Sequence, residues 1–156
     1  MSYKEHKKGY RAAAYLLFGI YLVLMVYFLF FAESMGRNTS AQEYHYNLHP
    51  LREINRYIRH CHRLGMWPVM LNLAGNVVAF VPFGAFLPFL QRKCRSFFRV
   101  ALYSFEVSLA VELIQLVYRV GSCDVDDVIL NTLGGMLGYI CFFTVRHHYQ
   151  KGIRSR

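Results

Sequence analysis

Long uncharged runs divide the chain into four apolar segments. Residues 12–32, 64–91 and 128–145 contain no Asp, Glu, Lys or Arg, and residues 100–118 contain only Glu106 and Glu112. About 20 predominantly apolar residues form a helix long enough to cross the hydrocarbon core of a bilayer. The pattern therefore predicts an all-α polytopic membrane protein, a bundle of four transmembrane helices at residues 12–32, 67–90, 99–118 and 126–145.

The segment ahead of the second predicted span is amphipathic. Apolar residues recur at three- and four-residue spacing from Leu51 to Leu64, and arginines occupy the other face: Arg52, Arg56, Arg59 and Arg63. This pattern is typical of a helix that lies in the membrane interface, so residues 50–64 are predicted to form an extracellular interfacial helix. Its basic face either binds anionic lipid headgroups or only caps the bundle in solvent, and the pattern leaves both open.

The second predicted span is longer than a straight crossing needs, and it contains Pro82. Proline has no backbone N–H and clashes with the preceding helical turn. We therefore expect this helix to kink or to end early near Pro82.

Composition supports the membrane interpretation, because 55% of the residues are hydrophobic and only 17% are charged. The formal charge of +9 would suggest a nucleic-acid partner in a soluble protein. With the N-terminus inside, however, twelve of the 18 Lys and Arg residues fall on the cytoplasmic side, as the positive-inside rule requires. The sequence therefore predicts a multi-pass membrane protein with both termini cytoplasmic and no nucleic-acid partner.

The four cysteines show neither a CxxC pair nor metal-ligand spacing. We therefore expect no metal site and no cofactor. Cys61 and Cys123 are both predicted to lie outside the membrane and could form a disulfide bridge.

Polar side chains inside the predicted spans form the candidate site. A charge at the centre of a span costs about 2.5–3.5 kcal/mol on insertion scales, so each such residue needs a partner or a purpose. Three pairs fall at a single predicted depth near the outer surface: Asn72 and Asn76, Glu112 and Gln115, and Asp127 and Asn131. Asp124 and Arg119 flank the spans at the same end, and Arg119 could pair with Glu112 or only anchor the interface. Residues three or four apart share a helix face, so these side chains predict a polar ligand-binding pocket open to the outside. Glu106 stands apart near mid-membrane, and the pattern gives it no partner.

Structural roles can explain part of this set. Asp is favoured as a helix N-cap, which fits the acidic residues that open the last span. Asn72 and Asn76 could serve only as hydrogen-bonding partners between helices. Gly134, Gly135 and Gly138 are predicted to permit close helix packing rather than to form a binding loop.

Three motifs resemble those of the VanZ-like family of bacterial membrane proteins. They are NLAGNVVAFVPFG at residues 72–84, ELIQ at residues 112–115 and DVDDVILNTLGGMLGY at residues 124–139. The resemblance covers residues 48–139 and implies a single VanZ-like membrane domain over residues 1–156. It also implies a role at the bacterial envelope, since the founding member is associated with low-level resistance to teicoplanin-type glycopeptides. No established catalytic mechanism comes with it.

The leading hypothesis is an accessory, non-enzymatic protein that protects against lipoglycopeptide antibiotics through the outward pocket. Its expected partners are membrane lipid, a lipid-linked cell-wall precursor or the antibiotic itself. The alternative is an enzyme that modifies an envelope lipid or precursor, with Glu112 and Asp127 as an acid–base pair or as ligands for a divalent cation. Against it, GxSxG and HExxH signatures are absent, and no histidine lies within the predicted spans. A transporter would require a homo-oligomer through the Gly134/Gly138 face, because four helices enclose only a small conduit.

Overall fold

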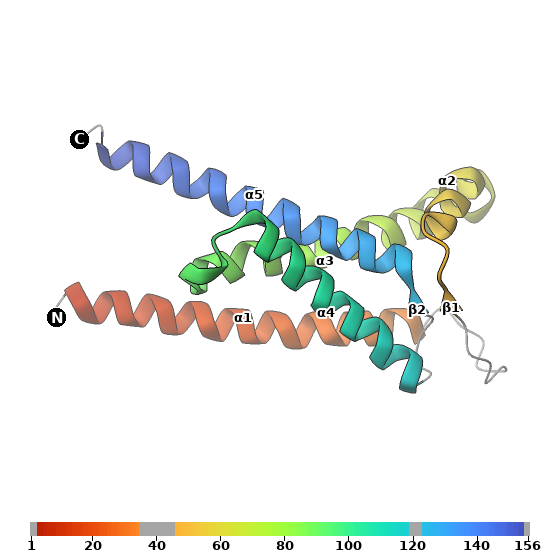
Figure 1. Ribbon diagram of the computed structural model, residues 1–156, viewed down its shortest axis with the longest axis horizontal. Coiled ribbons are helices and arrows are strands. Elements are labelled where there is room, and N and C mark those ends of the chain that lie inside the picture. The colour runs from red at the N-terminus through yellow and green to blue at the C-terminus, as the bar shows by residue number, and fades with distance from the viewer. Residues whose placement is uncertain (1–2, 35–45, 119–122, 155–156) are drawn as a thin grey trace.

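The computed structural model confirms the all-α fold and describes residues 3–34, 46–118 and 123–154. Four long helices run along the molecule (Figure 1): α1 (Tyr3–Ser34), α3 (Met66–Leu90), α4 (Phe97–Tyr118) and α5 (Val125–Arg154). Each contains a segment long and apolar enough to cross a membrane: Gly9–Phe30, Val69–Leu90, Phe97–Tyr118 and Val125–Gly152. The chain is therefore built as a polytopic membrane protein.

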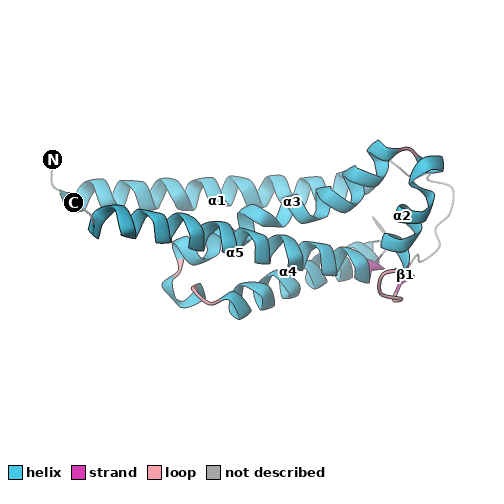
Figure 2. Ribbon diagram, turned by 90° about the horizontal axis from the view of Figure 1, so that it is seen from above, coloured by secondary structure: helices cyan, strands magenta, loops and turns pink. Residues whose placement is uncertain are grey.

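Shorter elements occupy the two ends of the bundle. Helix α2 (Arg52–Leu64) lies across one end (Figure 2), where the two-residue strands β1 (Tyr46–Asn47) and β2 (Cys123–Asp124) pair in parallel. We call this end the α2 end. The 3₁₀ turn η1 (Arg92–Cys94) joins α3 to α4 toward the opposite end, where both chain termini lie.

The expected early end of helix α3 at Pro82 was wrong, and the expected kink there stays a prediction. The helix continues to Leu90 with Pro82 and Pro88 inside it. A proline in a helix removes one N–H and leaves the carbonyl of the preceding turn without its usual partner. Membrane helices tolerate this where neighbouring helices support the backbone, and α5 packs directly against this part of α3 through its glycines.

Two of these glycines bring α5 onto the backbone of α3. A Cβ atom added at Gly134 would overlap the Val77 carbonyl oxygen, and one at Gly138 would overlap the Val81 carbonyl oxygen. Small residues at such positions let helix backbones approach closely, as their pattern predicts. The expected route to a homo-oligomer through this face was wrong, because α3 of the same chain already covers it.

Gly135 faces the third member of this packing unit. A Cβ atom there would overlap the Ser104 hydroxyl of α4, and a Cβ atom at Gly84 of α3 would overlap the Gly135 carbonyl oxygen. Helix α5 therefore packs closely against both α3 and α4.

Helix α1 joins this unit through an apolar core. Met25 and Leu29 of α1 pack with Phe80, Phe83 and Val111 from α3 and α4. Many of the other large apolar side chains of α1 face outward. In a bilayer these outward faces meet lipid tails instead of water.

Candidate functional site

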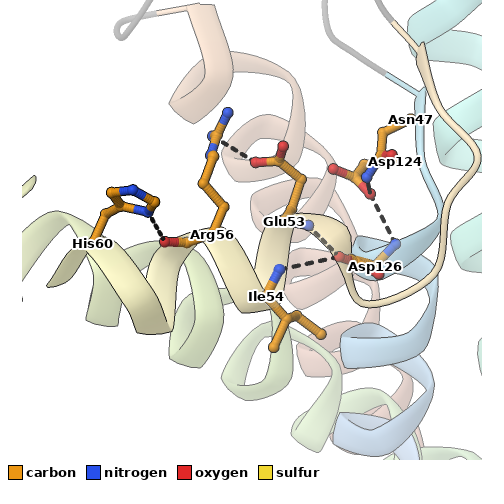
Figure 3. A network of polar contacts seen from close by, with 7 residues as sticks. All are labelled: Asn47, Glu53, Ile54, Arg56, His60, Asp124 and Asp126. Carbon is orange, nitrogen blue, oxygen red and sulfur yellow. Dashed lines mark hydrogen bonds and ion pairs between the residues drawn. The ribbon is translucent and has the colours of Figure 1, made fainter.

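The α2 end is held together by a network of buried polar groups (Figure 3). Its first link is the short β1–β2 pair, which joins Asn47 to Asp124. The Asn47 side chain donates a hydrogen bond from Nδ2 to Asp124 Oδ1 at 3.1 Å, and its Oδ1 accepts one from the His49 N–H at 3.3 Å. One asparagine therefore ties the segment before α2 to the start of α5.

Asp126 forms the strongest link, because its carboxylate caps a helix other than its own. One oxygen accepts a hydrogen bond from the Leu51 N–H, and the other accepts from the Glu53 N–H at 2.8 Å and the Ile54 N–H at 3.1 Å. The residue before α2, Leu51, provides no side-chain cap and has a left-handed backbone with φ of 66°. The first N–H groups of a helix lack intrahelical partners. Here the carboxylate of Asp126, distant in the sequence, accepts their hydrogen bonds, and its negative charge complements the helix dipole.

Asp124 has a different role, as the N-cap of α5. Its Oδ1 accepts a hydrogen bond from the Asp126 N–H at 2.8 Å, two residues into the turn, as an N-cap side chain does. Burial raises the pKa of the Asp124 carboxyl above its ordinary value of 3.8, and the carboxylates of Asp126 and Glu53 raise it further. The hydrogen bonds from Asn47 and from the Asp126 N–H act in the opposite direction.

Glu112 connects the end of α4 to the same network. It is 3% exposed, and its Oε2 accepts a hydrogen bond from the Asp124 N–H at 2.9 Å. Asn76 of α3 donates a hydrogen bond to Asp127 Oδ1 at 2.5 Å, which ties α3 to α5. We call Asn47, Asn76, Glu112, Asp124, Asp126 and Asp127 the α2-end network.

A second set of polar side chains lies about one helical turn from Glu112 and Asp127. Asn131 Nδ2 donates a hydrogen bond to Ser108 Oγ at 2.8 Å, and Gln115 Nε2 donates one to the Leu29 carbonyl of α1 at 3.0 Å. The remaining side-chain oxygens of Asn131 and Gln115, and the Ser104 hydroxyl, have no hydrogen-bond partner among the described residues. These side chains join α1, α4 and α5, but part of their hydrogen-bonding capacity is unused among the described residues.

The structure brings six of the predicted site residues together at the α2 end: Asn76, Glu112, Gln115, Asp124, Asp127 and Asn131. Asn72, by contrast, is exposed. Arg119 lies outside the described residues, and so does the side chain of Cys61 in its predicted bridge to Cys123.

Residues 18–146 match the model of the family described as VanZ/LLP1. The chain belongs to the VanZ/LLP1 family. It is also 40% identical over 63 residues to Protein VanZ from Enterococcus faecium, a match that spans 40% of this chain and 38% of that protein. No solved structure matches the chain. With its four apolar helices, this VanZ/LLP1 member is a multi-pass membrane protein.

The sequence did not reveal the roles of three residues that hold segments of this VanZ/LLP1 chain together. Asp126 was grouped with its neighbours as a helix opener, yet it caps α2 from more than 70 residues away. Asn47 stood out only in the segment 47–51, which resembles the family's element ahead of the second span, and Ser108 was not singled out, although they bind Asp124 and Asn131. The cluster of aspartates within residues 124–127 was the only sequence signal for such a contact. A cluster of identical residues does not indicate which carboxylate turns toward α2.

The acidic side chains at this end already accept hydrogen bonds within the protein, which limits the chemistry they can perform. Backbone N–H groups donate to the carboxylates of Glu112, Asp124 and Asp126. Burial raises the pKa of the Cys123 thiol, and the nearby carboxylates raise it further, so this thiol is a poor nucleophile. Within the described ranges, no group of three His, Cys, Asp or Glu residues could hold a metal ion. The arrangement is suited to fixing α2 in place rather than to acid–base chemistry at an open carboxylate.

Proposed function

We propose that this protein supports low-level resistance to teicoplanin and related lipoglycopeptides at the bacterial envelope, and that it acts through its α2 end. One observation carries the proposal: the Asp126 carboxylate binds three N–H groups at the start of α2. The basic helix is thereby fixed across the end of the bundle, where it forms a surface of defined position. Membership of the VanZ/LLP1 family and the similarity to Protein VanZ support this role.

The distribution of cations supports an outward α2 end. Both chain termini and η1, with their lysines and arginines, lie toward the opposite end (Figure 1). Basic segments are retained on the cytoplasmic side, which directs α2 outward. In a background with Cys61 and Cys123 replaced by Ser, a membrane-impermeant maleimide applied to intact cells tests this orientation: it labels Arg59→Cys and does not label Lys93→Cys. The reverse labelling would overturn the assignment.

The exposed face of α2 provides the interaction surface. Arg52, Arg56 and Arg59 are exposed, and Arg56 is paired with Glu53 at 2.5 Å. Arginines on an interfacial helix attract anionic headgroups and phosphates. Teicoplanin carries an acyl chain that favours membrane association, unlike vancomycin. A basic helix held at the outer surface interferes with the anchoring of that chain or with access to lipid-linked cell-wall precursor.

Antibiotic susceptibility of a sensitive Gram-positive host tests the proposal. Expression of the wild-type chain is expected to raise the inhibitory concentration of teicoplanin and to leave that of vancomycin unchanged. Replacing Arg52 and Arg59 together with Gln removes surface charge without touching the α2-end network, and it is expected to abolish protection. The matched control replaces Arg92 and Lys93, also exposed, with Gln at the opposite end.

Membrane abundance of each variant is measured so that loss of protein is not read as loss of function. Glu112→Gln is included as a variant of the network itself. The proposal fails if the wild-type chain gives no selective protection. Protection that survives the Arg52 and Arg59 replacement would show that the exposed face of α2 is not the working surface.

A lipid- or precursor-modifying enzyme is the second candidate. Raised carboxyl pKa values are common at catalytic sites, and burial raises the pKa of Asp124 beside Glu112. If the protein is such an enzyme, membranes that contain it have an altered lipid or precursor profile, and Glu112→Gln abolishes the change. An unaltered profile would remove the enzyme from consideration.

A further inference from the structure

A carboxylate at mid-membrane points away from the bundle. The buried face of α4 is formed by Val100, Ser104, Ser108, Val111, Glu112 and Gln115. Glu106 is two residues from both serines, so it lies about 160° around the helix from each of them. Its side chain is exposed. In the part of the chain that the structure describes, it has no hydrogen bond or ion pair.

The depth of Glu106 makes this exposure unfavourable. It lies near the centre of the candidate span Phe97–Tyr118. Ionisable residues at that depth normally face the bundle interior or pair with another polar group, because lipid tails cannot solvate them. The fold of one chain satisfies neither condition, so a partner must come from outside it.

Apolar residues on the same face of α4 show what kind of partner fits. Leu102, Glu106, Leu109 and Leu113 follow each other at four-, three- and four-residue spacing, and the three leucines are 53%, 37% and 50% exposed. This alternation is the seam of a two-helix coiled coil, in which a single polar residue fixes the register. The seam is self-complementary, since its apolar positions pack against the same positions of an identical helix.

We propose that two copies of this chain pair through this seam of α4, about a two-fold axis along the membrane normal, with the two Glu106 carboxyls in contact. A two-fold axis places each residue opposite its own copy at the same depth. Carboxyl groups can hydrogen-bond to one another. The pair thereby satisfies both groups within the membrane.

A second copy fits better than a cationic partner segment of the same chain. The Lys and Arg residues of the chain fall outside the central part of the four spans, near or beyond their ends. The Gly134/Gly138 face is covered by α3, so it is not available for assembly. Pairing through α4 is independent of the proposed function.

Energy transfer between donor- and acceptor-tagged chains in liposomes measures the pairing. With fluorophores fused to the C-terminus, the wild-type chain is expected to show transfer that falls as lipid is added. Glu106→Leu is expected to weaken association at least tenfold. Glu106→Gln keeps a hydrogen-bonding side chain at the same position and is expected to retain most of it.

Oxidative cross-linking provides a second measurement that does not depend on removing Glu106. In a Cys141→Ser background, Leu109→Cys on the seam is expected to cross-link copies, whereas Ile114→Cys, equally outward but about 100° from the seam, does not. The parent without an added cysteine gives the baseline. The proposal is overturned by a wild-type chain that is monomeric at every lipid ratio, by unaltered association of Glu106→Leu, or by equal cross-linking at both positions.

Discussion

Replacing Asp126 with Ala is expected to release the start of α2 from the bundle while the long helices stay packed. The substitution removes a carboxylate that is 1% exposed and that accepts hydrogen bonds from the N–H groups of Leu51, Glu53 and Ile54. No side chain next to α2 takes over this role, because the residue before the helix provides no cap. The helix dipole also loses its negative partner.

The size of the effect follows from these contacts. Hydrogen bonds to a charged group each contribute about 1.5–3 kcal/mol, and loss of an Asp N-cap costs about 0.5–2 kcal/mol. The three bonds share one carboxylate and their N–H groups gain water when freed, so a net loss of about 2 kcal/mol is expected. Since about 1.4 kcal/mol corresponds to a factor of ten, the local opening of α2 becomes roughly thirtyfold more frequent.

Hydrogen–deuterium exchange in lipid nanodiscs measures that opening directly. Amides at the start of α2 are expected to exchange roughly thirtyfold faster in Asp126→Ala, and amides in the middle of α4 serve as the unchanged internal reference. Glu53→Gln is the matched control at the same end. It removes only the half-exposed ion pair with Arg56, which is worth about 0–1 kcal/mol, so it leaves protection of α2 nearly unchanged.

Unaltered protection of α2 in Asp126→Ala would refute the reasoning, because it would mean that the cap does not hold the helix. Equal loss of protection in α2 and in the middle of α4 would also refute it, because the network would then stabilise the whole bundle rather than this one contact.

Three further substitutions test other parts of the structure. In Asp124→Asn, the amide oxygen can accept both hydrogen bonds now made to Oδ1. Because the pKa of the Asp124 carboxyl is raised in the folded protein, the free energy of unfolding of the wild-type chain falls as pH rises from near 3.8 through the raised value. In the variant, the free energy of unfolding is expected to depend less on pH and to show no loss at neutral pH. Gly138→Ala is expected to cost about 1–3 kcal/mol by forcing α3 and α5 apart, whereas Gly19→Ala meets nothing within 4 Å and leaves thermal stability in detergent unchanged or higher. Ser108→Ala removes the hydroxyl that accepts a hydrogen bond from the buried Asn131 amide and is expected to cost about 1–3 kcal/mol. Ser104→Ala removes a buried hydroxyl without a partner among the described residues and is expected to be neutral or stabilising. A loss of stability in Ser104→Ala equal to that in Ser108→Ala, in the same unfolding assay, would contradict this assignment.

The spans and the amphipathic helix were readable from the sequence because each is set by local pattern. An uncharged run of sufficient length has few alternatives to a membrane helix, and the spacing of arginines against apolar residues defines the two faces of α2. The early helix end expected at Pro82 was wrong, because the close packing of α5 on α3 supports the helix through this position.

The candidate site was only partly readable. Spacing correctly gathered Asn76, Glu112 and Asn131 at one end, because residues one helical turn apart share a face. It could not assign roles to Asp124 and Asp126, which are adjacent to the same helix start and chemically identical. One caps α5 and the other caps α2, and this difference depends on where a distant segment lies.

The sequence by itself determined that this protein has four segments long and apolar enough to cross a membrane, a basic amphipathic helix and costly polar groups near one end. These features follow from composition and periodicity, which act over one or a few helical turns. Only the tertiary structure decided that Asp126 holds α2, that the glycines of α5 are used within the chain and that Glu106 points outward. Those outcomes depend on which helix lies beside which, and no local preference along the chain specifies that.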